Sequence, residues 1–157
     1  MRVGFGYDVH PFTSGRKLIL GGETIPYEKG LNGHSDADVL IHSLIDALLG
    51  AAGEGDIGLH FPDNDEKYKN ISSLKLLETT LELLKAKGLK INNIDISIVL
   101  EEPRLLPFIA KMKKNILKVM NISLEKINIK ATTNEKMGFI GRKEGVAAYC
   151  IVSLDDR

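Results

Sequence analysis

Hydrophobic positions alternate with polar ones in some stretches of the chain and recur at helical spacing in others. Alternation predicts strands, because successive side chains of a strand point to opposite faces, whereas a spacing of three or four residues predicts helices. The predicted strands cover residues 2–10, 17–20, 91–101, 127–131 and 146–154. The predicted helices begin at about Ala37, at about Ser73 and at about Leu106, and the last two end near Lys87 and Met120.

The first predicted helix is hydrophobic over most of its surface. Its large aliphatic residues are Val39, Leu40, Ile41, Leu44, Ile45, Leu48 and Leu49, too many for one narrow stripe. We therefore expect it to be buried on most sides. Ser35, Asp36 and Asp38 offer oxygens that can cap its start, and Gly50 and Gly53 mark its end.

The predicted elements follow the order β-β-α-α-β-α-β-β, without a strict βαβ rhythm. This order favours an α+β fold: a two-layer sandwich with one mixed β-sheet and helices on one face. No linker, repeat or low-complexity segment interrupts the chain, so residues 1–157 are expected to form a single domain. Residues 54–71 form a long polar loop, and a loop of this length inside a compact domain is usually functional.

Charge and composition narrow the classes of partner. Lys plus Arg and Asp plus Glu both number 21, so no net charge attracts nucleic acid or an anionic membrane. We therefore expect neither as a partner. The single cysteine, Cys150, cannot form an internal disulfide, and no signal peptide or membrane-spanning stretch is evident. These features predict a cytoplasmic protein.

One group of residues has the composition of a metal site. Asp8 and His10 are two residues apart on a predicted strand, so their side chains point to the same face. His42 lies in the first helix, with Asp38 and Asp46 one turn away on either side as expected supporting carboxylates. Two histidines and one carboxylate form a known catalytic zinc set with an open coordination position, although manganese or iron would also suit these ligands.

The alternative to metal binding is that Asp8, His10 and His42 each have a purely structural role. A lone histidine on an apolar helix is more often a core residue than a ligand, and an Asp-x-His pair occurs by chance. Several polar loops add weight to the functional interpretation, although each alone is more typical of a turn. They contain Gly55–Gly58, 61–65, the His34-Ser35 pair before a helix start, and 131–136 with Arg142 beyond it. Together with the metal set they indicate a phosphorylated substrate.

The same motifs carry a family resemblance. In chain order they are Gly6-Tyr7-Asp8-Val9-His10, His34-Ser35-Asp36-Ala37-Asp38-Val39 with His42, Gly55-Asp56-Ile57-Gly58, Phe61-Pro62-Asp63 and Ala131-Thr132-Thr133-Asn134-Glu135-Lys136. Over residues 2 to about 154 the sequence resembles the 2-C-methyl-D-erythritol 2,4-cyclodiphosphate synthase family of the non-mevalonate isoprenoid pathway.

The resemblance implies a reaction and an assembly. The substrate would be 4-diphosphocytidyl-2-C-methyl-D-erythritol 2-phosphate, whose 2-phosphate attacks the β-phosphorus of its own diphosphate. The cyclic diphosphate forms and CMP leaves without consumption of water, which makes the enzyme a phosphorus–oxygen lyase. The family forms homotrimers with active sites at the subunit interfaces, and an isoprenoid diphosphate in the central cavity is a further implied partner.

The resemblance also implies roles for individual residues. Asp8, His10 and His42 would bind one divalent metal per subunit, zinc by preference, and Glu135 would lie near a second ion, magnesium or manganese. His34 and Thr133 would be catalytic. The residues matching the substrate-binding pattern are Asp8, His10, His34, Ser35, Asp56, Ile57, Gly58, Phe61, Pro62, Asp63, Asn64, Asp65, Leu100, Pro103, Arg104, Leu105, Leu106, Ala131, Thr132, Thr133, Asn134, Glu135, Phe139 and Arg142.

Three positions depart from the family pattern. Arg104 stands where many members have lysine, and its planar fork changes the contact geometry while keeping the charge. Asn134 replaces a common threonine. Tyr7 replaces a phenylalanine of some members at a position that, with Arg142 and Glu144, faces the central cavity of the family trimer.

Two other functions are compatible with a metal set of this kind. A zinc hydrolase would use metal-bound water and need a general base such as Glu135 or Asp56, but neither residue lies in a hydrolase motif. A non-catalytic protein with a structural metal is less consistent, because structural zinc sites are usually closed and rich in cysteine, and this chain has one cysteine.

Overall fold

The computed structural model describes residues 1–156, and Arg157 lies outside the described residues. The strands are β1 (Arg2–Thr13), β2 (Leu18–Leu20), β3 (Glu23–Ile25), β4 (Gly30–Leu31), β5 (Leu89–Val99), β6 (Ile127–Thr132) and β7 (Gly145–Asp156). The α-helices are α1 (Val39–Ala52), α2 (Ile57–His60), α3 (Ser73–Ala86), α4 (Ile109–Met120) and α5 (Gly138–Gly141). Three short 3₁₀ helices are η1 (Glu66–Tyr68), η2 (Leu106–Phe108) and η3 (Leu124–Lys126).

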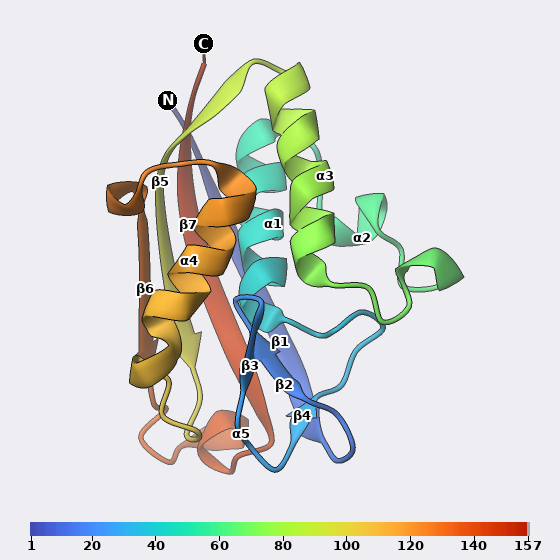
Figure 1. The fold of residues 1–157 in the computed structure, drawn as a ribbon, viewed down its shortest axis with the longest axis vertical. Helices are drawn as coiled ribbons and strands as arrows, with labels where there is room; N and C mark the ends of the chain where they lie inside the picture. Colours follow the sequence, from blue (N-terminus) through green and yellow to red (C-terminus); the bar gives the residue numbers. More distant parts are fainter. Residues whose placement is uncertain (157) are drawn as a thin grey trace.

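The main sheet has five strands in the order β4-β1-β7-β5-β6. The strands β1 and β7 pair antiparallel from Arg2 opposite Leu154 to Pro11 opposite Gly145, which brings the two ends of the chain together (Figure 1). The strands β5 and β6 are parallel, so the sheet is mixed and the predicted α+β class is confirmed. A separate hairpin of β2 and β3 lies beside the main sheet.

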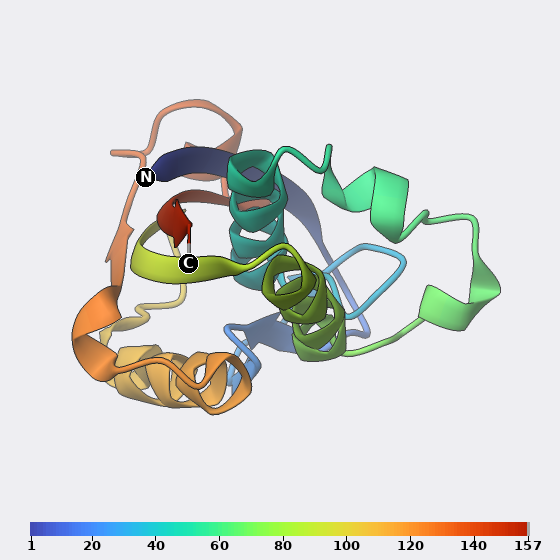
Figure 2. The same ribbon diagram turned by 90° about the horizontal axis from the view of Figure 1, so that it is seen from above.

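The helices α1, α3 and α4 cover one face of the sheet (Figures 1 and 2). The helix α1 packs against β1 and β7, and every large aliphatic residue predicted to be buried in it is at most 1% exposed. From the sheet, Ile94, Ile96 and Ile98 of β5 fill the same core. Within residues 1–156, no helix is both long enough and apolar enough to cross a membrane.

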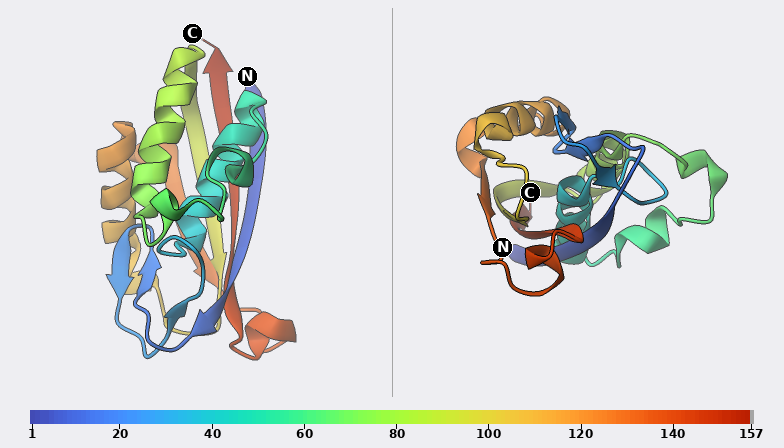
Figure 3. Two further views of the ribbon diagram at one scale, coloured as in Figure 1. Left: turned by 90° about the vertical axis from the view of Figure 1, so that its right-hand side faces the viewer. Right: turned by 90° about the horizontal axis from the view of Figure 1, so that it is seen from below.

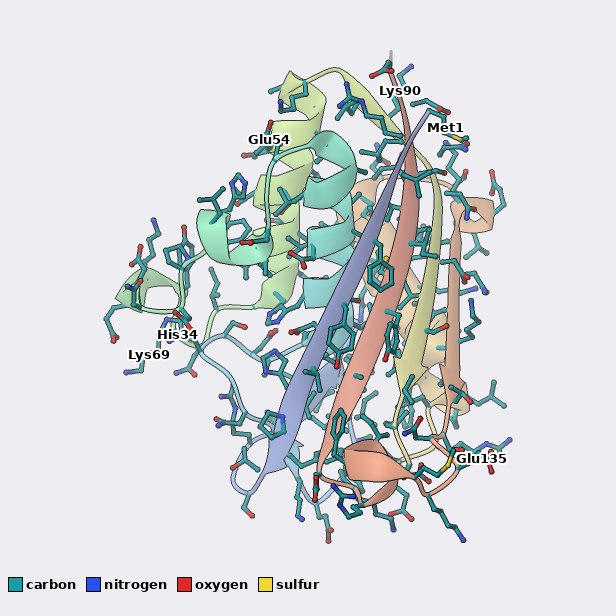
Figure 4. All side chains as sticks on the ribbon, turned by 180° about the vertical axis from the view of Figure 1, so that it is seen from behind. Met1, His34, Glu54, Lys69, Lys90 and Glu135 are labelled. Carbon is teal, nitrogen blue, oxygen red and sulfur yellow. The ribbon has the colours of Figure 1, made fainter. Side chains whose placement is uncertain are left out.

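The opposite face of the sheet is not covered by the helices (Figure 4). The large hydrophobic side chains of β1 point to this face together with Tyr149 and Ile151 of β7, and Phe5 and Ile151 are 61% and 52% exposed. In most strands the large apolar side chains face the core. In β1 the small residues Gly4 and Gly6 face the helices, and Val3, Phe5 and Tyr7 face away from them.

Those two glycines allow α1 to lie directly on β1. A Cβ atom at Gly6 would stand 1.9 Å from the carbonyl oxygen of Ser43, and one at Gly4 would stand 2.0 Å from that of Ala47. No side chain fits into such a space, so the backbones of strand and helix touch.

Several elements differ from the sequence prediction. The helix expected from Ala37 begins at Val39, because Ala37 has a positive φ of 56° and the Asp38 side chain caps the first turn by accepting from Ile41 N–H. The strand expected over residues 17–20 is β2, which ends before Gly21 as predicted, but the chain then turns at Gly21 and Gly22 and returns as β3, which the sequence did not predict. On α3 the leucines at helical spacing all contact the core: Leu77 and Leu84 are buried, and Leu74 and Leu81 are half-buried and pack against it.

The two long loops contain short elements that the sequence did not predict. Residues 54–71 include α2 and η1 and project to one side of the molecule (Figures 2 and 3). Residues 132–144 include α5. The predicted helix over residues 106–120 is η2 followed by α4, and Pro107 lies in the 3₁₀ turn.

We predict that Gly6→Ala lowers the free energy of unfolding by about 3 kcal/mol or more, because the added methyl group displaces α1 from β1. Gly50→Ala is the matched control: Gly50 lies in α1, and a Cβ there meets only the Phe5 carbonyl oxygen at 4.0 Å. It should raise stability by about 0.5–1 kcal/mol through helix propensity. Urea unfolding of the two variants tests this, and equal effects would contradict it.

Candidate active site

The strand β1 and the helix α1 bring together the three residues predicted to bind metal. Asp8 Oδ2 lies 2.9 Å from His10 Nε2 and 3.0 Å from His42 Nδ1. The two ring nitrogens are 3.2 Å apart. All three side chains are partly shielded from solvent, and among the described residues they form the one group of three or more potential metal ligands.

The outer nitrogen of each histidine is the ring nitrogen that points away from Asp8. The contact made by the outer nitrogen of His10 decides which of its two ring nitrogens carries the proton. His10 Nδ1 lies 2.8 Å from the backbone carbonyl oxygen of Asn32, which can only accept a hydrogen bond. Nδ1 therefore carries a proton. In the neutral ring, Nε2 then presents its lone pair to Asp8.

The outer nitrogen of His42 faces two hydroxyl groups. Its Nε2 lies 2.9 Å from Ser73 Oγ and 3.0 Å from Ser35 Oγ. The Ser73 hydroxyl donates its own proton to Asp36 Oδ1 over 2.5 Å, so toward His42 it can only accept. His42 Nε2 therefore donates, and Nδ1 of the neutral ring presents its lone pair to Asp8.

Three lone pairs thus converge on one point, and they repel one another unless a positive charge lies between them. Either a metal ion or additional protons on the rings can supply that charge. A tetrahedral zinc ion with bonds of about 2.0 Å would hold its ligand atoms about 3.3 Å apart. The observed separations of 2.9, 3.0 and 3.2 Å are close to this value, and the donor set fits zinc with a position left for a further ligand.

The titration of these groups follows from the same contacts. Burial alone would raise the pKa of the Asp8 carboxyl, but when the rings carry the additional protons, their hydrogen bonds and charges outweigh burial and lower that pKa to about 2. Burial disfavours the charged form of His10, yet its hydrogen bond to Asp8 and the charge of Asp8 raise the His10 pKa. The carboxylate is therefore ionised at neutral pH and attracts cations to the triad.

The carboxylates expected to support His42 have other partners. Asp38 accepts hydrogen bonds from the N–H groups of Gly21, Gly22 and Ile41, so it caps α1 and fixes the turn between β2 and β3. Asp46 accepts from Ile57 N–H. The prediction from helix spacing was therefore wrong, because it considered only one helix, whereas the support for His42 comes from Ser35 and from the start of α3.

A cavity of about 480 Å³ surrounds the triad. Of the residues predicted to bind substrate, it is lined by Asp8, His10, His34, Ser35, Ile57, Gly58, Phe61, Pro62, Asp63 and Asn64. The loop before α1 and the loop around α2 supply most of these, so residues distant in sequence meet at one site. Tyr68 and Leu76 also line the cavity and carried no recognisable signal in the sequence.

A second cavity, of about 620 Å³, lies at the other edge of the sheet, beside β6 and η2. It is lined by the predicted residues Leu100, Pro103, Arg104, Leu105, Leu106, Ala131, Thr132 and Thr133. Among the described residues the two cavities share no lining residue. His34 and Glu135 lie on opposite sides of the molecule (Figure 4), so residues predicted to bind one substrate lie far apart within a single chain.

Two of the remaining predicted residues lie in the loop around α2. The Asp56 side chain caps α2 by accepting from Leu59 N–H. Asp65 caps η1, and its backbone carbonyl oxygen lies 2.9 Å from His34 Nε2. The His34 side chain is thereby attached to the loop that covers the cavity.

The others follow β6. Asn134 N–H donates to Glu101, and the Glu135 carboxylate accepts from the Thr133 hydroxyl over 3.4 Å. Phe139 belongs to α5, and Arg142 pairs with Glu144 over 2.9 Å. Asn134, Glu135, Phe139 and Arg142 themselves lie outside the lining of both cavities.

Arg16 is a residue near the site that the sequence did not single out. Its guanidinium donates to the backbone carbonyl oxygens of Gly33 and Ser35, over 2.6 and 2.5 Å. These two carbonyls flank His34. Arg16 therefore fixes the backbone that carries His34 and Ser35, which only the folded structure could reveal.

A family model described as the YgbB family matches residues 1–155. The chain belongs to the YgbB family. The 2-C-methyl-D-erythritol 2,4-cyclodiphosphate synthase of Syntrophobacter fumaroxidans is 57% identical over 154 residues, which are 98% of this chain and 97% of that relative. The resemblance stated from the motifs is therefore confirmed over the whole chain.

Solved structures of related proteins share the fold. A 2C-methyl-D-erythritol-2,4-cyclodiphosphate synthase in a CDP-bound form has a TM-score of 0.90 at 34% identity, covering 98% of this chain and all (100%) of that chain. The bifunctional IspDF from Campylobacter jejuni has a TM-score of 0.96 at 46% identity and covers 99% of this chain. This chain spans only 42% of that bifunctional protein.

We predict that Arg16→Gln lowers the free energy of unfolding by about 1–2 kcal/mol, because two hydrogen bonds from a charged donor are lost. Lys17→Ala, an exposed neighbour, should change it by no more than about 0.5 kcal/mol. Chemical denaturation measures both. A crystal structure of Arg16→Gln should show residues 33–35 displaced, and an unchanged loop with unchanged stability would refute the role of Arg16.

Proposed function

We propose that this chain is a cyclodiphosphate synthase of non-mevalonate isoprenoid biosynthesis. It converts 4-diphosphocytidyl-2-C-methyl-D-erythritol 2-phosphate into 2-C-methyl-D-erythritol 2,4-cyclodiphosphate and CMP. An oxygen of the 2-phosphate forms a bond to the β-phosphorus, the bond from that phosphorus to the bridging oxygen breaks, and CMP leaves with the bridging oxygen. Because no water enters, the enzyme is a phosphorus–oxygen lyase.

The observation that carries this proposal is the convergence of Asp8, His10 and His42 inside a cavity lined by the family motifs. Identity of 57% with a synthase over 98% of the chain supports the same chemistry. The CDP-bound form of a related synthase supports a cytidine nucleotide as part of the substrate. A single synthase domain over residues 1–157 is part of the proposal.

The triad would hold zinc, and zinc bound there supplies a Lewis acid to a phosphate oxygen. The residues of the chain position the substrate. His34, fixed by Arg16 and by Asp65, faces the cavity beside the triad and would contact the transferring phosphoryl group. Phosphoryl transfer needs mainly alignment and charge stabilisation, which fixed donors in a partly shielded cavity provide.

The chain would divide substrate recognition between its two cavities. The cavity around the triad, with Ile57, Gly58 and 61–64, would bind the methylerythritol phosphate. The cavity around Leu100, 103–106 and 131–133 would bind cytidine. Thr133 would contact the diphosphate, and Glu135 beside it would bind a second ion, magnesium or manganese, since a single carboxylate plus phosphate oxygens suits such ions.

The two cavities lie at opposite edges of the sheet. A homotrimer of two-layer subunits would therefore bring the triad cavity of one subunit next to the second cavity of its neighbour. The face of the sheet without helices would turn toward the centre of this assembly, which explains why Phe5 and Ile151 are large and apolar. Tyr7 and Tyr149, with ring centroids 5.0 Å apart, would line a central cavity open to an isoprenoid diphosphate near Arg142. A cytoplasmic location completes the proposal.

Phosphorus NMR of the product tests the reaction. The cytidyl substrate should yield CMP and a cyclic diphosphate, and reaction in ¹⁸O-labelled water should leave the product unlabelled. A linear phosphate product that contains solvent oxygen would instead identify a zinc hydrolase and overturn the proposal.

We predict that His42→Ala loses zinc and activity together, with kcat lower by about 100-fold or more. The variant should still fold, with a loss of about 2 kcal/mol, because the core does not depend on the metal. His60→Ala is the control, since His60 bonds to the Glu54 carbonyl outside the triad. Metal analysis and a thermal melt of each variant measure zinc content and stability. A His42→Ala protein that is unfolded yet loaded with metal would contradict the prediction.

A further inference from the structure

We infer that Ser73, held by Asp36, is a positioning residue that sets the affinity of the triad for its metal ion. This inference rests on the proposed metal centre. Ser73 does not contact the converging ligand atoms and is not itself among the residues that line the cavity, so it would act only through the ring of His42.

Ser73 and Asp36 form a rigid unit. Ser73 is fully buried at the first position of α3. Asp36 Oδ1 accepts from the Ser73 hydroxyl over 2.5 Å and from Asp38 N–H over 3.1 Å, and Asp36 Oδ2 accepts from Ser73 N–H over 3.0 Å. With three donors on one carboxylate, neither residue can turn without leaving a shielded polar group unpaired.

This unit controls which nitrogen of His42 carries the proton. A carboxylate can only accept, so the single hydroxyl proton of Ser73 is directed at Asp36 and the Ser73 lone pair at His42 Nε2. The contact requires a proton on Nε2 and leaves Nδ1 free. Ser35 Oγ, which also faces Nε2, accepts from Ala37 N–H over 3.2 Å and can rotate its own proton, so it does not impose one tautomer.

Two physical effects then favour metal binding. The ring is held in the orientation and tautomer that binding requires, so no free energy is spent on reorganising it. The negative charge of Asp36, transmitted through the hydroxyl, also makes the ring a better electron donor. Loss of such outer partners typically weakens metal binding about 10- to 100-fold.

The same contacts connect the metal site to the loop over the cavity. Asp36 N–H donates to the Ile71 carbonyl over 3.0 Å, and Asn70 N–H donates to the His34 carbonyl over 2.8 Å. The end of the loop that contains η1 is thereby attached beside Ser73. The loop end and the Ser73 side chain that contacts the His42 ring are thus both bonded to Asp36.

Zinc titration of the metal-free protein against a competing chelator tests the inference without substrate. Ser73→Ala should bind zinc about 10- to 100-fold more weakly than the unmodified protein. Ser43→Ala is the matched control, because Ser43 is also fully buried and its hydroxyl donates only to the Leu40 carbonyl. Thermal melts of the metal-free variants should show similar small shifts, which separates affinity from folding.

A double-variant cycle tests whether Asp36 acts through Ser73. Adding Asp36→Asn to Ser73→Ala should cause little further loss of zinc affinity, whereas Asp36→Asn alone should weaken it. Equal affinities of Ser73→Ala and Ser43→Ala would overturn the inference. An unmodified protein that does not bind zinc would overturn the proposed metal centre itself, so the two failures are distinguishable.

Nitrogen NMR of the histidine rings needs no variant at all. In the zinc-loaded protein, His42 Nε2 should carry a proton that exchanges slowly with solvent, and Nδ1 should show the shift of a metal-bound nitrogen. Coordination through Nε2, or a rapidly exchanging proton on that nitrogen, would overturn the role of Ser73 even if every variant folded poorly.

Discussion

The contact between the backbones of β1 and α1 is the constraint on which the site depends. Gly4 and Gly6 leave room for helix carbonyls where any Cβ atom would collide. His42 precedes Ser43, whose carbonyl lies against Gly6, and Asp8 and His10 follow on the same strand. Two ligands from the strand and one from the helix can meet within hydrogen-bond distance only because the two elements are this close. The constraint also explains why the large side chains of β1 point away from the helices.

Electrostatics organises what this contact brings together. The outer nitrogens of His10 and His42 are both committed to acceptors, so the inner nitrogens and the Asp8 carboxylate concentrate electron density at one point. The arrangement is unfavourable without a cation and favourable with one, which is how a folded chain can select for a metal without a disulfide or a closed cysteine cage. Arg16 and Asp36 extend this organisation outward, because each fixes a segment that carries a cavity residue.

Sequence patterns predicted the features that depend on local chemistry. The sequence predicted the buried character of α1, the Asp8-His10-His42 set and the order of the motifs. Periodicity and spacing depend on residues that are close in sequence, and the motifs match those of a known family. The partners of His42 were not predicted correctly. Spacing along one helix suggested Asp38 and Asp46, whereas Ser73 lies 31 positions away in sequence and contacts His42 only in the folded chain. Arg16, the short helices in the loops and the outward face of β1 were missed for the same reason, since tertiary contacts decide them.

The separation of the two cavities has a genetic consequence in the proposed ring assembly. Each complete site would take its metal half from one subunit and its cytidine half from the next, through a head-to-tail interface that closes on itself. A chain defective at His42 and a chain defective at Arg104 would then each be inactive alone, yet a mixture of the two could rebuild some intact sites. Alleles that damage opposite edges of the sheet would complement one another, whereas alleles that damage the same edge would not.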